Sequence, residues 1–254
     1  MERIEESQRL LDYLHLEIQF LRTRFALSNL QRGEHKEAET WFQLVYDTRR
    51  KRYGEESEDT YDNKLILALL QKEQGKFREA EILLWQVVGA RMKLLGNGHA
   101  KTIRAINYLG EVLEKQGQTK CAVKLYRHTL QRYEIYDKNA RIEALVCLEQ
   151  LAQIHARRNN LGEAENLGRQ LVGRRENLLG REHLDTLIGV HTLAKILMKS
   201  RVYEEACSLH ERAYAGMERV VGPEHPDTKE FLEDFDWAKK IVEQKFSKSE
   251  YHVA

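Results

Sequence analysis

Histidines at matching places are the first residues in this sequence that could do chemistry. His99, His183 and His225 each lie three residues before a threonine, and 84 and 42 residues separate neighbours. A zinc ion needs its ligands about 2 Å away, whereas residues one repeat apart are separated by the width of a pair of helices. We therefore predict a structural role for each histidine at its own joint, and no metal site.

Two glutamates, Glu111 and Glu149, could be considered as an acid/base pair because both are expected to face one surface. Surfaces on which 32% of residues are charged produce such pairs by chance, and nothing in the sequence indicates the burial that general acid–base catalysis requires. The sequence has no H-E-x-x-H, GxxxxGK[ST], GxGxxG or GxSxG motif. We predict no catalytic residues, no cofactor and no enzyme activity.

The composition excludes several other classes. With 41 basic and 40 acidic residues the net charge is +1, so no overall field attracts nucleic acid or an anionic membrane. The basic cluster "TRRKRYG" (48–54) ends a predicted helix, where cations are favourable. The longest apolar run, 65–70, is too short to span a bilayer, and the N-terminus lacks the apolar core of a signal peptide.

The three cysteines, Cys121, Cys147 and Cys207, form no C-x-x-C pair, and no N-x-[ST] acceptor is present. We interpret them as small buried side chains of a soluble cytoplasmic protein in a reducing compartment.

A 42-residue unit recurs along the chain without insertion or deletion. It is marked by an alanine column, by a turn column five residues earlier, and by a second turn column near the end of each unit. These columns are Ala38, Ala80, Ala122, Ala164 and Ala206; Gly33, Gly75, Gly117, Asn159 and Arg201; and Gly54, Gly96, Lys138, Gly180 and Gly222. Glycine and asparagine can take the left-handed conformation that ends a helix, so Arg201 is the exception in the first turn column.

Each unit therefore consists of two helices, with Asp or Thr expected to cap the first. We predict helix A of each unit over 61–74, 103–116, 145–158, 187–200 and 229–245, and helix B over 36–52, 78–94, 120–136, 162–178 and 204–220. The small residue five positions after the turn allows close helix contact, and an apolar column packs neighbouring A helices: Phe25, Leu67, Leu109, Leu151, Leu193 and Phe235. One unit cannot bury its apolar face alone, so the units must stack.

The joint "LGREHLDT" (179–186) and the turn "QGKFREAE" (74–81) resemble tetratricopeptide repeats of the kinesin light chain type, which also occur in fungal nucleotide-binding signalling proteins. The resemblance covers nearly the whole chain. It implies an all-α, right-handed superhelical solenoid of antiparallel helix pairs, whose concave face, lined by helix A, binds a peptide or partner domain. We expect one array over 1–245 and a flexible tail over 246–254, divided into a truncated helix or N-terminal cap (1–17), repeats 18–54, 60–96, 102–138, 144–180 and 186–222, and a capping helix (228–245).

The groove positions follow if the apolar column packs inward, because they then lie two and five residues before it and two after it. These positions are Phe20, Leu27, Leu65, Leu69, Arg104, Asn107, Glu111, Glu149, Gln153, His191 and Lys195. The resemblance adds that Asn107 occupies a place where related repeats often hold a peptide-binding asparagine. Tyr108 could add an aromatic wall and Trp237 an anchor.

Alternatives exist at these positions. Tyr108 and Trp237 could fill the core between repeats, and Asn107, Glu149 and Lys195 could lie on a solvated face. The apolar first third could be covered by the N-terminal helix or by a neighbouring subunit.

We predict a non-catalytic scaffold that grips a peptide or helix of a protein partner, with an apolar segment near Leu65 and Leu69 and a polar segment from Arg104 to Lys195. The alternatives are an oligomerisation or sensor segment of a larger signalling protein, and a small-molecule enzyme with its site in the groove. The sequence leaves the oligomeric state open.

Overall fold

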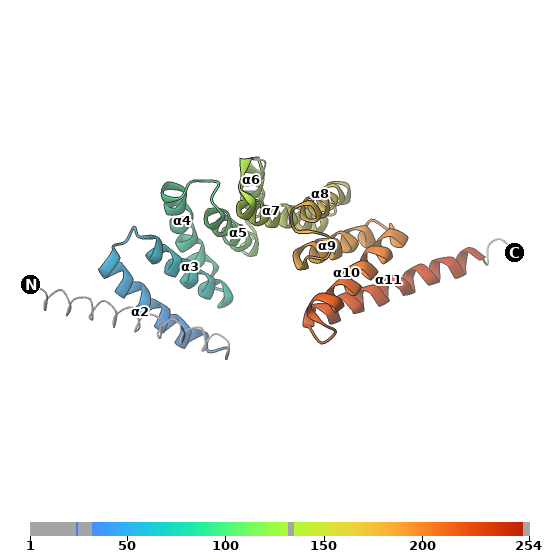
Figure 1. Cartoon of the computed structure of the whole chain (residues 1–254), viewed down its shortest axis with the longest axis horizontal. Helices are drawn as coiled ribbons and strands as arrows, with labels where there is room; N and C mark the ends of the chain where they lie inside the picture. The colour runs from blue at the N-terminus through green and yellow to red at the C-terminus, as the bar shows by residue number, and fades with distance from the viewer. Residues whose placement is uncertain (1–23, 25–31, 132–134, 251–254) are drawn as a thin grey trace, which may run out of the picture. The chain divides into compact units, whose positions relative to one another are not determined.

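The computed structural model describes residues 24, 32–131 and 135–250, with the side chains of residues 35 and 246–250 excepted. Every regular element in this part of the chain is a helix (Figure 1). The helices are α2 (His35–Tyr53), α3 (Glu58–Glu73), α4 (Phe77–Leu94), α5 (Ala100–Lys115), α6 (Thr119–Leu130), α7 (Lys138–Arg157), α8 (Leu161–Leu179), α9 (Leu184–Lys199), α10 (Tyr203–Val221) and α11 (Pro226–Glu250). The predicted all-α class is confirmed. None of these helices combines the length and apolar composition that a membrane span needs.

The chain divides into two compact units, one up to Ala122 and one from Val123. In the first unit α2 packs on α3, α3 on α4, and α4 on α5. In the second unit α7 packs on α8, α8 on α9, α9 on α10, and α10 on α11. From α2 to α5 and from α7 to α11, each helix thus contacts the next one along the chain, as in a stack of helical hairpins. Several predictions fall outside the described part of the chain: the N-terminal cap (1–17), the groove residues Phe20 and Leu27, and the apolar-column residue Phe25.

The predicted columns lie where stacking requires them. All five alanines of the alanine column are fully buried, and the apolar column is buried at Leu67, Leu109, Leu151 and Leu193. Phe235 at the end of the column is only half-buried and stacks on Tyr214 with ring centroids 6.3 Å apart. The cysteine prediction is right for Cys147, whose thiol pKa is raised by burial, but wrong for the exposed Cys121.

The turn column takes the left-handed conformation in all five units. Gly33, Gly75 and Gly117 have φ of 76°, 75° and 77°, and Asn159 and Arg201 have φ of 58° and 64°. Arg201 therefore does not change the turn. The turn holds Arg201 in the left-handed conformation although a side chain disfavours it, because the Cβ then lies too close to the following carbonyl oxygen.

The joints between units use a different hydrogen bond from the one we expected. Thr60, Thr102, Thr186 and Thr228 do not accept amide hydrogen bonds in a cap; instead each hydroxyl donates to the carbonyl of the glycine six residues earlier, at 2.8–2.9 Å. The amides are capped by the residue before the helix. Nδ1 of His99, His183 and His225 accepts from the backbone N–H two residues on, at 3.2 Å, and Ser57 plays this part in its unit. The predicted structural role of the joint histidines is confirmed.

Helix boundaries shift for the same reason. Four A helices begin at residues 58, 100, 184 and 226, three residues before their predicted starts. The reason is that the capping residue is the serine or histidine three residues before the threonine, and not the threonine itself. At the joint with Lys138 in place of glycine, α6 ends at Leu130 rather than 136. There Asp137 accepts from the N–H of Ala140 at 2.9 Å and starts α7 seven residues early, while the Tyr136 hydroxyl donates to the Thr129 carbonyl at 2.9 Å.

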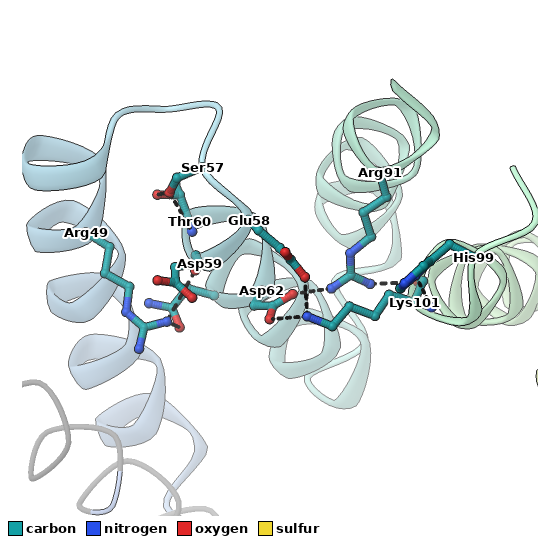
Figure 2. A network of polar contacts seen from close by, with 10 residues as sticks. Arg49, Ser57, Glu58, Asp59, Thr60, Asp62, Arg91, His99 and Lys101 are labelled. Atoms are coloured by element: carbon teal, nitrogen blue, oxygen red, sulfur yellow. Dashed lines mark hydrogen bonds and ion pairs between the residues drawn. The ribbon is translucent and has the colours of Figure 1, made fainter. Parts of the chain in front are cut away.

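A buried arginine near the end of helix B links consecutive helices in both units. In the first unit Arg91 on α4 donates to the Lys101 carbonyl on α5 at 2.9 Å and to Asp62 on α3 (Figure 2). Lys101 in turn pairs with Glu58 and Asp62 of α3. Arg49, one period earlier, donates to the Asp59 carbonyl at 3.3 Å. These contacts bridge helices that follow one another along the stack.

Replacing Arg201 with glycine should stabilise the chain. The substitution relieves the left-handed strain at φ 64°, and we expect the free energy of unfolding to rise by about 0.5 to 1 kcal/mol after the extra chain entropy of glycine is subtracted. Urea denaturation followed by circular dichroism measures this.

The matched control is Gly117→Ala, which adds the strain that Arg201→Gly removes. A Cβ at Gly117 would meet no atom within 4 Å, so its effect is conformational. It should lower the free energy of unfolding by about 1 kcal/mol. No gain in Arg201→Gly, or no loss in Gly117→Ala, would contradict this account of the turn.

Candidate functional site

Four of the predicted site residues line one cavity of about 420 Å³ in the second unit. Glu149 and Gln153 come from α7, and His191 and Lys195 from α9. The remaining lining residues are Ala156, Arg157, Ile188, Thr192, Ile196, Lys199, Asp227, Glu230 and Phe231. We call this cavity, formed by α7, α9 and α11, the C-terminal groove. Glu149 and Gln153 are four residues apart on α7, and His191 and Lys195 are four residues apart on α9. The two residues of each pair therefore lie on one face of their helix, on successive turns.

One wall of the C-terminal groove is held by a buried ion pair. Arg175 on α8 donates to Glu149 Oε2 at 2.8 Å and to the Asp185 carbonyl at 2.8 Å. The Thr192 hydroxyl on α9 donates to Glu149 Oε1 at 3.1 Å. Glu149 is only 8% exposed, so it does not lie on a solvated face. The carboxylate has a partner on each oxygen and is fixed in one orientation.

Lys195, on α9, has two contacts to α11. Its Nζ lies 3.2 Å from Glu230 Oε1 and 3.4 Å from Asp234 Oδ2. Partial burial disfavours the charged ammonium, but the hydrogen bond to Glu230 and the charge of Asp234 outweigh it and raise the pKa of Lys195. The lysine is half exposed and remains charged. It can reach a ligand at the cost of its contacts to α11.

His191 is the least accessible of the four residues, at 5% exposed. Its ring stacks on Phe231 with centroids 3.7 Å apart and meets His210 of α10 edge-on at 5.1 Å. Burial, with smaller contributions from His210 and Lys195, lowers the pKa of His191 to about 3 despite the nearby Asp234. Burial also lowers the pKa of His210. Both rings are therefore neutral at pH 7.

The other predicted residues lie elsewhere. Leu65 and Leu69 are on α3, and Arg104, Asn107, Tyr108 and Glu111 are on α5, all in the first unit. Leu65 and Asn107 are buried, with Asn107 only 4% exposed, so the solvated-face alternative fails for Asn107. Arg104 is exposed.

Lys72 brings two of these α5 residues together. Its Nζ pairs with Glu111 at 3.0 Å and lies 5.6 Å above the ring of Tyr108. Trp237, on α11, is 54% exposed, does not fill the core between repeats, and is not among the lining residues of the C-terminal groove.

Sequence reasoning missed three residues that shape the site: Arg175, Phe231 and His210. Arg175 had a signal, because it lies 84 residues after Arg91, at the same place in its unit. The prediction did not make use of this match. His210 had no such signal, since no histidine occupies its position in the other units.

A second cavity, of about 460 Å³, also lay outside the predictions. It is in the first unit and is lined by α3 and α4 residues together with the loop before α3, including Tyr61, Lys64 and Trp85. Lys64 is buried there and donates to Glu55 and Gln86 at 3.0 Å each.

Three segments of the chain, 102–135, 144–185 and 190–227, match the sequence profile of the family described as tetratricopeptide repeat. These three segments are similar to tetratricopeptide repeats. The matches fall on three of the predicted units, 102–138, 144–180 and 186–222, and two of them include Glu149, Gln153, His191 and Lys195 of the C-terminal groove. Repeats of this family generally serve as non-catalytic scaffolds for protein interaction.

Solved structures with the same fold include other repeat proteins. A kinesin light chain protein of Podospora anserina with nearly identical TPR-like repeats shares 24% identity at a TM-score of 0.64, covering 78% of this chain and 93% of that one. BtubC (BKLC) from P. vanneervenii shares 16% at a TM-score of 0.64, covering 92% and 87%. The apo form of the quorum sensor NprR from B. thuringiensis shares 12% at 0.68, covering 96% and 66%.

The predicted resemblance to repeats of the kinesin light chain type is therefore confirmed at the level of the fold. No curated protein sequence matches the chain.

The two buried histidines should make the second unit sensitive to acid. His191 and His210 stay neutral in the folded chain because burial lowers their pKa values, whereas both titrate near 6.5 in the unfolded chain. Between about pH 6.5 and 5 the unfolded chain therefore binds more protons. The stability present above about pH 6.5 is lost as the pH falls, by up to about 1.4 kcal/mol per pH unit for each histidine.

Urea denaturation at several pH values measures the slope. His191→Phe keeps a ring stacked on Phe231 and removes one titrating group, so it should remove about half of the slope in this window. The control Gln170→Ala, at an exposed position that carries no titrating group, should leave the slope unchanged. An unchanged slope in His191→Phe would contradict the assignment.

Proposed function

We propose that this chain is a non-catalytic scaffold that holds a peptide or short helical segment of a partner protein in the C-terminal groove. The observation that carries the proposal is the joint contribution of Glu149, Gln153, His191 and Lys195 to one cavity. Its volume, about 420 Å³, falls within the range of pockets that enclose a ligand. Such a cavity can take one or two side chains of a bound segment.

The lining of the groove suits a peptide with an apolar residue flanked by charges. Ile196 and Phe231 are buried apolar residues and offer a surface for an aliphatic or aromatic side chain. Gln153 can donate to and accept from a peptide backbone. Lys199 can pair with an acidic side chain and Asp227 with a basic one.

The groove is preorganised, which supports binding of a flexible segment. Glu149 and Lys195 are already held by partners on neighbouring helices, so few side chains need to be ordered when a ligand binds. An ordered groove on a helical scaffold is one of the common ways to recognise a peptide. Affinity then depends mainly on how well the peptide fills the apolar floor.

The first-unit residues Leu65, Leu69, Arg104, Asn107, Tyr108 and Glu111, together with Trp237, stay predictions as contacts to a partner. Asn107 lines neither of the two cavities described above. We therefore assign the first contact with a partner to the C-terminal groove.

Changing the accessible groove residues should weaken binding of a peptide selected on the full chain from a random displayed library. The double variant Gln153→Ala/Lys199→Glu removes a backbone partner and reverses a charge, and we expect the affinity to fall at least about tenfold, equivalent to roughly 1.4 kcal/mol. Fluorescence anisotropy of the labelled peptide measures this. The matched control Lys239→Glu reverses an exposed charge on α11 that does not line the groove.

Equal affinity in the wild-type chain and the double variant would place the peptide elsewhere and contradict the proposal. If no peptide is selected and the mass rises with concentration in sedimentation, the oligomerisation alternative is favoured instead. Saturable binding and turnover of a small molecule would favour the enzyme alternative.

A further inference from the structure

Three side chains with metal-binding donor atoms converge beside the C-terminal groove, and one of them also lines it. They are His191 on α9, His210 on α10 and Asp234 on α11, and one donor atom of each lies within 4.8 Å of the others. We propose that they form a binding site for a divalent transition-metal ion, with zinc as the best match. This inference does not depend on peptide binding, because its ligands are built into the chain.

The buried ring nitrogens of this cluster lack the hydrogen-bond partners that buried groups normally have. Both ring nitrogens of His191 and Nδ1 of His210 are buried without a hydrogen bond in the part of the chain that the structure describes, whereas Asp234 Oδ2 has an ion-pair contact to Lys195 at 3.4 Å. The two histidines are 5% and 1% exposed. Buried polar atoms of this kind are rare, because they lose water without a replacement. A metal ion among them would take up lone pairs from both rings and from the carboxylate.

The distances are compatible with zinc. Tetrahedral zinc binds nitrogen and oxygen at about 2.0–2.2 Å, which places neighbouring ligand atoms about 3.3 Å apart. Nε2 of His191 and Oδ2 of Asp234 are already 3.2 Å apart. The two separations to the His210 donor atom are within 4.8 Å, so each needs to shorten by about 1.5 Å at most, which rotation of a side chain can supply.

The charges around the cluster decide how an ion would enter. Lys195 Nζ lies 3.4 Å from Asp234 Oδ2 and competes with a metal for that oxygen. The same ammonium also contacts Glu230 at 3.2 Å, so it can leave Asp234 and keep a carboxylate partner. Burial lowers the pKa of both imidazoles, so their lone pairs are available at neutral pH.

The donor set argues against the common hard cations. Calcium and magnesium prefer oxygen ligands, whereas two imidazoles and one carboxylate suit zinc and its neighbours in the first transition series. Three protein ligands leave one tetrahedral position for water. Because the ligands come from three consecutive helices, a bound ion would tie α9, α10 and α11 together.

The full chain is first freed of metal with a chelator and then titrated with zinc sulfate alone. Isothermal calorimetry should show one ion per chain, and cobalt(II) should give the visible absorption of a tetrahedral complex. His210→Gln and Asp234→Asn should each weaken zinc binding at least about tenfold. The matched control Asp236→Asn, an exposed residue two positions away on the same helix, should bind zinc like the wild-type chain.

A chelator-reversible rise in melting temperature with zinc provides a second measurement, since an ion that binds only the folded chain stabilises it. Circular dichroism checks that each variant is folded. If His210→Gln does not fold, the comparison of Asp234→Asn with Asp236→Asn still decides. The proposal is overturned if the wild-type chain takes up no ion with one-to-one stoichiometry, or if Asp234→Asn binds zinc as tightly as Asp236→Asn.

Discussion

The buried arginines that join three consecutive helices are the interaction on which the geometry of this protein depends. Arg175 on α8 contacts a carboxylate on α7 and a backbone carbonyl at the start of α9, and Arg91 does the same between α3 and α5. A charge this deeply buried is tolerated only with partners in place, and removing one partner of such a pair costs about 3 to 5 kcal/mol. The buried ion pairs therefore constrain the position of each of these helices relative to the next.

The C-terminal groove follows from that constraint. Glu149 is held by Arg175 on one oxygen and by Thr192 on the other, so α7 and α9 are fixed to each other at the level of the cavity. Phe231 packs in the same core as Leu187 and Val190, which places α11 at the other side. The histidine and aspartate cluster lies at this second contact. The binding surface and the cluster are thus both products of helix stacking.

Much of this could be predicted from the sequence because stacking repeats the same demands every 42 residues. The alanine column and the left-handed turn column predicted the helix pairs, and the apolar column predicted which face packs inward and hence that Glu149, Gln153, His191 and Lys195 share a surface. The joint at Lys138 could not be predicted this way, because it lacks the glycine of the other joints and is capped by Asp137, which belongs to no column. His210 and Asp234 were missed for the same reason, since their positions do not recur.

The most direct test of this account is a double-mutant cycle of Arg175 and Glu149, with stability measured by native-state hydrogen exchange of amides in α7 and α9. Arg175→Met and Glu149→Leu each leave one buried charge unpaired, whereas the double variant removes both charges. The account predicts that the double variant loses clearly less stability than the sum of the two single variants, with a coupling of roughly 2 to 3 kcal/mol. Losses that simply add, with no coupling between the two sites, would contradict it.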